Sequence, residues 1–273
     1  MRPDTDTADT ADTADTVIDT VIVIDTDTDT DTDTVRSGTA ASAAPVGFDL
    51  VALDMAGTTI EEHGAVYAAL RDAVEAAGVP VPAAALERWM GADKRAAVTA
   101  LLAASGRPEP AAETVRAVYG TFRARLAAAY RDRPPTALPG VEAALARLRE
   151  HGVRVALTTG FDREVVDGLL AALGWESGVV DAVLCADDVP VGRPAPYLIF
   201  RAMERTGVTD VSRVLCAGDT ELDLRAGANA GAGAIVGVLT GAHGVDILGR
   251  TRHTHLLASV ADLPDLVLGA SPR

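Results

Sequence analysis

The chain has 273 residues, 48% of them hydrophobic, and a formal net charge of −15, which suits one or two domains with a well-filled core. Residues 1–45 contain eleven Asp and two Arg, so the rest of the chain carries only −6 and has no basic footprint for nucleic acid. No apolar run approaches the roughly 20 residues of a membrane-spanning helix. The two cysteines, Cys185 and Cys216, are predicted to be reduced core residues of a cytoplasmic protein.

The first 45 residues form a low-complexity tail. They are almost entirely Asp-Thr and Ala-Asp-Thr repeats, broken by one apolar run at 17–24. Most of the tail has too little apolar surface to offset the entropy of ordering, so disorder is predicted. It lacks the basic start and cleavage pattern of a secretory signal. We hypothesise that it is a translated tandem repeat upstream of a true start at Val35 or Val46.

The rest of the chain alternates strands with helices. The predicted strands lie at 48–53, 153–158, 181–186, 213–217 and 233–239, and the predicted helices at 141–150, 162–173, 195–206 and 221–230. This alternation is the βαβ signature of an α/β fold with a Rossmann-like parallel sheet. Residues 62–136, between the first two strands, have helical apolar spacing throughout. The sequence therefore predicts a core at 46–61 and 137–273, with a helical cap at 62–136 over the carboxyl ends of the strands.

Asp54 is the first candidate for chemistry. It follows the apolar strand at 48–53 and opens into a Gly-Thr turn. In α/β sheets, chemistry collects at the carboxyl ends of strands, and an aspartate there can attack phosphorus to form an acyl phosphate. Alone, so short a pattern is explained equally well by a solvated Asp at a strand end. Thr58 is predicted to cap the turn after this residue.

Three later segments add groups of matching chemistry. Thr159 and Gly160 follow the second strand, where a hydroxyl and backbone amides can hold phosphoryl oxygens. Arg193, in the sequence Gly-Arg-Pro-Ala-Pro, offers a fixed positive charge to a phosphorus transition state. Asp219 and Asp223 follow the fourth strand and are hard oxygen ligands of the kind that Mg²⁺ binds. Singly, these residues are also explained as helix caps or solvated charges; in this order they indicate one site.

With these four motifs the chain resembles the haloacid dehalogenase-like hydrolase superfamily over about residues 46–260. Within it, the chain looks most like the phosphonatase branch, the phosphonoacetaldehyde hydrolases and their relatives. Ala56 stands where phosphatases of the superfamily carry a second Asp, and Arg193 replaces their more usual Lys. The segment from Met90 to Lys94 looks like the cap segment that carries the Schiff-base lysine of phosphonatases.

The resemblance implies a role for each group. Asp54 would be the nucleophile, Arg193 would offset the charge on nucleophile and phosphoryl group, and Lys94 would form an imine with the substrate. The ligands of a catalytic Mg²⁺, including a backbone carbonyl and a carboxylate that orients the metal shell, would be Asp54, Ala56, Asp219 and Asp223. The substrate-binding residues would be Thr58, Thr159 and Gly160.

Ala56 and Lys94 separate the subclasses. Ester cleavage benefits from a general acid by about 10² to 10⁴-fold, which the methyl group of Ala56 cannot supply. A phosphonate carbon leaves only if the neighbouring carbonyl first becomes an iminium, and this requires a lysine amine. Lys94 is the only lysine of the chain; a lone lysine is otherwise more often a solvated helix charge. Phosphonatases carry a His one turn beyond this lysine, where the chain has Ala97.

The leading hypothesis is a Mg²⁺-dependent phosphonatase-like hydrolase that acts on a small organophosphorus compound, such as phosphonoacetaldehyde, through an aspartyl-phosphate at Asp54. The enzyme alternative is a phosphatase for a small phosphate ester, similar to phosphoglycolate phosphatases. The alternative of another class is a module that binds a phospho-ligand without turnover. The resemblance also implies a homodimer formed through the cap.

Overall fold

The computed structural model describes residues 47–104 and 109–269, so the tail predicted at 1–45 lies outside the described residues. Its strands are β1 (Leu50–Asp54), β2 (Ile60–Glu61), β3 (Thr136–Ala137), β4 (Arg154–Thr158), β5 (Ala182–Leu184), β6 (Val214–Gly218), β7 (Ala234–Val238) and β8 (His255–Leu257). Its α-helices are α1 (Ala65–Ala76), α2 (Ala83–Glu87), α3 (Lys94–Ala103), α4 (Ala112–Asp132), α5 (Val141–Glu150), α6 (Arg163–Leu173), α7 (Tyr197–Thr206), α8 (Glu221–Ala230), α9 (Val245–Leu248) and α10 (Leu263–Leu268). Three short 3-10 helices are η1 (Ala186–Asp188), η2 (Val211–Arg213) and η3 (Val260–Asp262).

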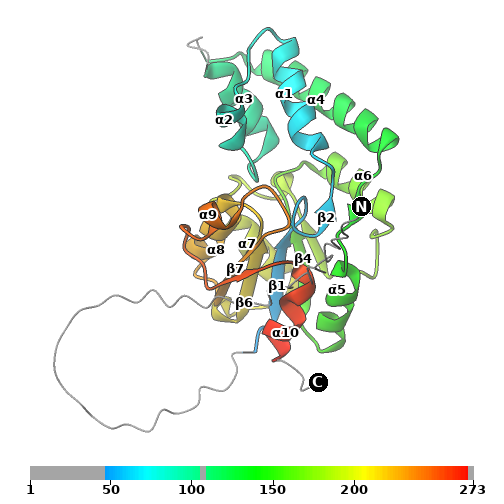
Figure 1. The fold of residues 1–273 in the computed structure, drawn as a ribbon, viewed down its shortest axis with the longest axis vertical. Coiled ribbons are helices and arrows are strands. Elements are labelled where there is room, and N and C mark those ends of the chain that lie inside the picture. Colours follow the sequence, from blue (N-terminus) through cyan, green and yellow to red (C-terminus); the bar gives the residue numbers. More distant parts are fainter. Residues whose placement is uncertain (1–46, 105–108, 270–273) are drawn as a thin grey trace, which may run out of the picture.

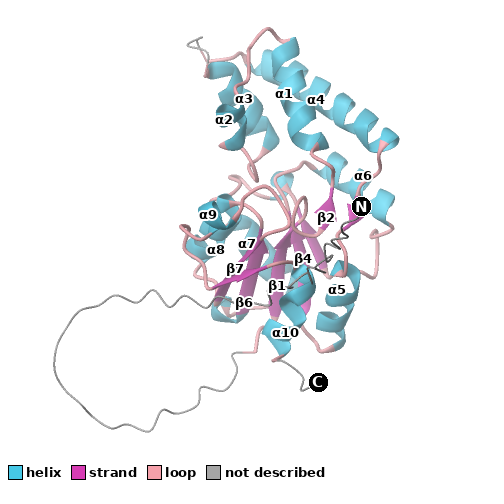
Figure 2. Ribbon diagram, in the orientation of Figure 1, coloured by secondary structure: helices cyan, strands magenta, loops and turns pink. Residues whose placement is uncertain are grey.

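Six of these strands form one sheet in the order β5-β4-β1-β6-β7-β8, and every pairing in it is parallel (Figure 2). The α/β fold predicted from the sequence is therefore confirmed. All five predicted strands are present, with ends that differ by at most two residues. Because β1 lies between β4 and β6, the carboxyl ends of these three strands meet at one edge, where ligands bind in such sheets.

The alternation of residues along β1 divides the core into two layers. Val51 and Leu53 belong to the apolar cluster that includes residues of α5, α6 and α10, whereas Leu50 and Ala52 belong to the cluster with α7 and α8. Successive side chains of a strand point to opposite faces, so helices cover both faces of the sheet. All four residues are buried, which explains the continuous apolar run that ends at Asp54.

The four helices α1 to α4, here called the helical insert, lie between β2 and β3 in the sequence and beyond the carboxyl ends of the strands in space (Figure 1). Each long helix buries one stripe of residues three or four positions apart. In α1 this stripe is Val66, Ala69, Leu70, Ala73 and Val74, and in α4 it is Val118, Tyr119, Phe122 and Leu126. The helices lie where the sequence analysis expected them, and the division into two domains remains a prediction.

The two chain segments that join the insert to the rest of the molecule lie side by side. Ile60 pairs with Ala137 and Glu61 with Thr136 in the short antiparallel sheet of β2 and β3. This pair and β8 were not predicted from the sequence, since strands of two or three residues are too short to show a periodic pattern.

Two other expectations concern the core and the membrane. Cys185 and Cys216 are free and buried, as predicted for core residues. Among the helices at 47–104 and 109–269, none combines the length and the apolar character needed to cross a bilayer.

Candidate active site

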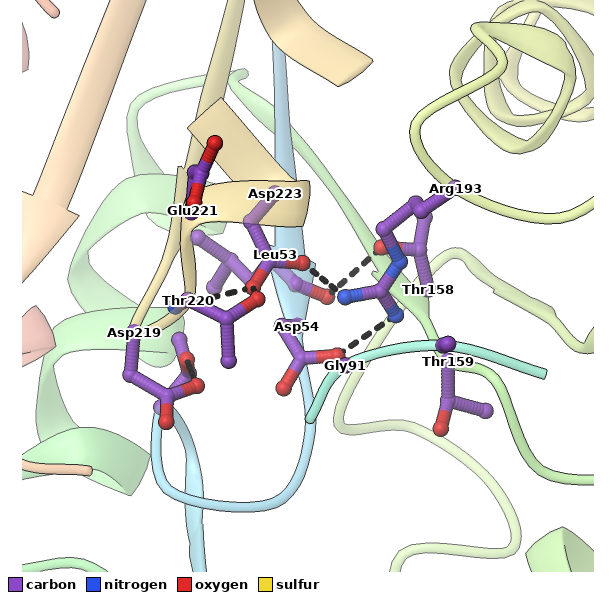
Figure 3. Close-up of polar contacts among 12 residues, drawn as sticks. Leu53, Asp54, Gly91, Thr158, Thr159, Arg193, Asp219, Thr220, Glu221 and Asp223 are labelled. Atoms are coloured by element: carbon purple, nitrogen blue, oxygen red, sulfur yellow. Dashed lines mark hydrogen bonds and ion pairs between the residues drawn. The ribbon is translucent and has the colours of Figure 1, made fainter. Parts of the chain in front are cut away.

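Asp54 is the last residue of β1 and lies at the centre of the candidate site (Figure 3). Its Oδ1 accepts a hydrogen bond of 2.6 Å from Nη2 of Arg193. Arg193 is itself buried, and it reaches Asp54 from the loop that precedes α7. A charge-assisted bond of this kind is strong and directional. It fixes the orientation of the Asp54 carboxylate.

Asp219 and Asp223 bring two further carboxylates to Asp54. One oxygen from each of the three residues lies within 4.8 Å of the others, and all three side chains are buried. Burial, and after it the charge of Asp54, raises the pKa of Asp219 to about 6. Buried carboxylate oxygens grouped in this way are the donors that a hard cation such as Mg²⁺ prefers.

Asp219 is held through both of its oxygens. Oδ1 accepts a bond of 2.9 Å from the hydroxyl of Thr58, and Oδ2 accepts one of 2.7 Å from the amide of Ala242. A methyl group at Gly57 or Gly241 would overlap with this carboxylate, so the two glycines make room for it. The loops after β1 and β7 thus position the Asp219 side chain.

Thr58 is engaged with Asp219 through its hydroxyl. Its binding of substrate remains a prediction: the side chain is fully buried, donates its hydroxyl to Asp219, and lines neither of the two cavities described below. The reason lies in the turn after β1, which the bond from the Thr58 amide to the carbonyl of Met55 closes at 3.2 Å. That turn directs the side chain of Thr58 toward the loop after β6.

Asp223 lies in the first turn of α8 and is fixed from two sides. One oxygen accepts bonds from the amide and the hydroxyl of Thr220, at 3.1 Å and 2.5 Å, and the other contacts Nη1 of Arg193. Thr220 is the N-cap of α8, so this is a capping box that also serves the site. Arg193 therefore joins Asp223 to Asp54, as Figure 3 shows.

Thr159 and Gly160 follow β4 at the same edge of the sheet. The amide of Thr159 donates to the carbonyl of Leu184 at 3.0 Å, and its hydroxyl accepts from the amide of Phe161 at 3.2 Å. A methyl group on Gly160 would overlap with the carbonyl of Ala92 in the insert. Glycine at this position allows the insert to approach the loop closely; the binding of substrate by both residues remains a prediction.

Lys94 is the first residue of α3 in the insert, and its side chain lies at the same edge of the sheet as Thr159 and Gly160. Its side chain is 3% exposed, and Nζ donates to the carbonyl of Ala92 at 2.7 Å. The ammonium lies 5.5 Å from the ring centroids of both Tyr67 and Phe161. Burial, and after it the charge of Arg193, lowers the pKa of Lys94 to about 8. A lysine in this state supplies a neutral amine far more readily than a solvated one.

Two cavities adjoin these groups. Asp54, Lys94 and Gly160 are among the residues that line an inner cavity of about 20 Å³. An outer cavity of about 250 Å³ has Glu62 and Asp219 among its walls. Tyr67 and Ala56 line both. Ala56, which stands where phosphatases of the superfamily carry an Asp, therefore borders the cavity beside the candidate nucleophile. The role of its carbonyl as a metal ligand remains a prediction.

Some residues of the site were not found from the sequence. Tyr67 looked like one more apolar position of a helix, yet its ring faces Lys94 and its hydroxyl accepts from the amide of Gly91 at 3.2 Å. His243 is buried, and its Nδ1 accepts from the amide of Glu221 at 3.0 Å. Ala97, the departure from the phosphonatase pattern, is fully buried in α3. Neither Tyr67 nor His243 has a sequence motif that would have marked it.

Comparison with known proteins agrees with this geometry. The haloacid dehalogenase-like hydrolase family model matches residues 48–231. A protein named phosphonoacetaldehyde hydrolase from Paraburkholderia phytofirmans is 28% identical over 198 residues, which cover 68% of this chain and 73% of that protein. Another of the same name, from Parabacteroides distasonis, is 33% identical over 126 residues, 46% of this chain and 47% of its own. The chain thus spans about half the length of that second relative.

The fold also resembles that of a solved structure. The phosphonoacetaldehyde hydrolase-like protein from Oleispira antarctica superposes with a TM-score of 0.67 at 21% identity, covering 88% of this chain and 100% of the other. The family match extends over most of the chain, from the strand before Asp54 to the end of α8. On this evidence, the chain belongs to the haloacid dehalogenase-like hydrolases.

Proposed function

We propose that this hydrolase is a Mg²⁺-dependent phosphonatase that cleaves the carbon–phosphorus bond of a small phosphonate, with phosphonoacetaldehyde as the first candidate substrate. The observation that carries the proposal is the position of Lys94. The only lysine of the chain is buried, has a lowered pKa, and lines the same small cavity as Asp54. The relatives named phosphonoacetaldehyde hydrolase support the same substrate class.

In the proposed reaction the neutral amine of Lys94 adds to the substrate carbonyl, and loss of water gives an iminium. The carboxylate of Asp54 then forms a bond to phosphorus, while the electrons of the carbon–phosphorus bond pass to the iminium and leave an enamine. Protonation of the enamine and hydrolysis release the aldehyde from Lys94, and water releases phosphate from Asp54. Arg193, bonded to Asp54, would offset the charge that gathers at phosphorus.

The acidic group fits the metal that the family implies. The oxygens of Asp54, Asp219 and Asp223 lie within 4.8 Å of one another. Burial, and after it the charge of Asp54, raises the pKa of Asp219, and a bound cation would offset both effects. These three residues, with the carbonyl of Ala56, are the proposed ligands of Mg²⁺. When bound, Mg²⁺ would neutralise the negative charge of the carboxylates and the phosphoryl oxygens. A cytoplasmic location and a homodimer remain predictions.

The test compares two substrate classes and one conservative substitution. Release of acetaldehyde and phosphate from phosphonoacetaldehyde is measured beside phosphate release from a panel of monoesters, including phosphoglycolate, on the wild type and on Lys94→Arg. Lysine-dependent release of acetaldehyde supports the proposal. Ester turnover that is unchanged in Lys94→Arg would make the protein a phosphatase, and binding without any turnover would make it a phospho-ligand module.

A further inference from the structure

A buried carboxylate, Asp162, lies where the helical insert meets the core, and its side chain is 4% exposed. Asp162 follows the Thr159–Phe161 loop and is the N-cap of α6, where its Oδ1 accepts from the amide of Val165 at 3.0 Å. Its Oδ2 accepts a bond of 2.8 Å from the hydroxyl of Tyr119 in α4. One carboxylate thus caps a helix of the core and binds a helix of the insert.

Two arginines of the insert surround the same oxygen. Nη2 of Arg95 lies 3.6 Å and Nη1 of Arg123 lies 3.5 Å from Oδ2 of Asp162. Each also reaches a second core carboxylate, Arg95 that of Asp187 at 3.7 Å and Arg123 that of Glu164 at 2.5 Å. The four residues Arg95, Tyr119, Arg123 and Asp162 are called the Asp162 cluster here. Apart from the cation–π contact of Arg95 with the ring of Tyr119, at 5.0 Å to the centroid, these attractions join the insert to the core.

The Asp162 cluster adjoins the proposed active site both in the insert and in the core. Arg95 directly follows Lys94, and Asp162 lies two residues beyond Gly160. Between these pairs, the amide of Lys94 donates to the carbonyl of Gly160 at 3.3 Å. A shift of the insert away from Asp162 would therefore move Lys94 away from the loop that carries Thr159 and Gly160.

Close to Lys94, the insert and the core fit together by shape. Gly91 has a φ of 76°, and a methyl group there would overlap with the hydroxyl of Thr220; one on Gly160 would overlap with Ala92. Such contacts limit how near the two parts come but provide little attraction. The contacts with Asp162 are attractive: its buried carboxylate accepts the hydrogen bond from Tyr119 and lies near two guanidinium groups. A hydrogen bond to a charged group is stronger than one between neutral groups.

We propose that Asp162 is a positioning residue whose carboxylate holds the insert closed and thereby keeps Lys94 buried beside Asp54. The role does not depend on which phosphorus bond the enzyme cleaves, because it concerns only the placement of the insert. Asp162 touches neither the inner nor the outer cavity, so it acts through the residues it holds.

The single lysine makes this directly measurable. An amine-specific acylating reagent labels Lys94 only when the insert opens, and peptide mass spectrometry separates that label from the one on the chain's amino terminus. The labelling rate follows the population of the open form. Tyr119→Phe removes the hydroxyl from the cluster and keeps the ring. Tyr130→Phe is its matched control, since Tyr130 lies on the same helix and its buried hydroxyl has no hydrogen-bond partner among the described residues.

Tyr119→Phe is expected to raise the labelling rate of Lys94 by about tenfold or more, as expected for a lost hydrogen bond to a charged group. Tyr130→Phe is expected to leave the rate unchanged. Asp162→Asn retains a good N-cap but loses the charge, so it too is expected to raise the rate, and added salt is expected to raise it in the wild type. The unfolding midpoints of both proteins are measured to confirm that they are folded. The proposal would be overturned if the labelling rates of Tyr119→Phe and the wild type agreed within twofold.

Discussion

Nη2 of Arg193 lies 2.6 Å from Oδ1 of Asp54, and Nη1 of the same guanidinium contacts Asp223. One cation therefore joins the proposed nucleophile to a carboxylate from α8. All three side chains are buried. Removal of the guanidinium would leave two buried carboxylates beside that of Asp219.

Arg193→Met is accordingly expected to lower kcat by about 10² to 10³-fold, the range seen when a fixed group that stabilises a transition state is removed. Arg193→Lys keeps the charge and is expected to retain part of this activity. Asp54→Asn is expected to abolish turnover. Steady-state phosphate release measures all three, and a kcat for Arg193→Met within threefold of the wild type would contradict the role of Arg193.

The lowered pKa of Lys94 predicts how imine formation depends on pH. An ordinary lysine, with a pKa near 10.5, is almost entirely protonated at neutral pH; with a pKa of about 8, the neutral fraction rises about tenfold between pH 7 and pH 9. Borohydride trapping of phosphonoacetaldehyde on Lys94 should rise by the same factor over this range. Lys94→Arg is the control and should trap nothing. A flat profile from pH 7 to 9 would show that the amine is not protonated in this range.

Gly160→Ala tests the fit between the insert and the core. The added methyl group would overlap with the carbonyl of Ala92, so the insert is expected to shift and the kcat to fall by tenfold or more, since small misplacements of reacting groups have large effects on rate. Gly168→Ala, in the neighbouring helix α6, meets nothing within 4 Å and should stabilise that helix by up to about 1 kcal/mol. Equal activity in the two variants would mean that the loop yields without moving Lys94.

Thr58→Val is expected to weaken Mg²⁺ binding by about 10 to 100-fold, because the hydroxyl that orients Asp219 is lost. Thr58→Ser keeps a hydroxyl and should bind the ion nearly as the wild type does. Isothermal titration with Mg²⁺ after treatment with a chelator measures both affinities without reference to turnover. If Thr58→Val binds Mg²⁺ as tightly as Thr58→Ser, the hydroxyl has no part in holding the ligand.

The main strands and helices were predictable because their signals are local. A buried run such as Leu50 to Leu53 and the helical stripe of α1 are read from neighbouring residues alone. β2, β3 and β8 were missed, since two or three residues carry no periodicity and their pairing depends on distant partners. In a parallel sheet the carboxyl ends of the strands lie at the same edge, so the proximity of the four motifs was also predictable.

The finer structure of the site was not predictable for a related reason. Asp54, Arg193 and Lys94 lie in recognisable patterns, but Tyr67 resembles any helix residue, and Asp162 reads as an ordinary N-cap until its partners from α3 and α4 are seen. The hydroxyl of Thr58, for which the resemblance implies a role in substrate binding, contacts a residue 161 positions away. Contacts of this length depend on packing, which one sequence does not display.

The pairing of β2 with β3 has a consequence for how such an enzyme can diversify. Both ends of the insert leave the core at adjacent residues, Glu61 and Thr136, which lie opposite each other in the antiparallel pair of β2 and β3. A module attached in this way can be lengthened, shortened or exchanged while the sheet that holds Asp54 and Arg193 stays intact. Selection on the choice of substrate and selection on phosphoryl chemistry can then act on separate stretches of the gene, and a chimaera joined at these two residues should keep its core.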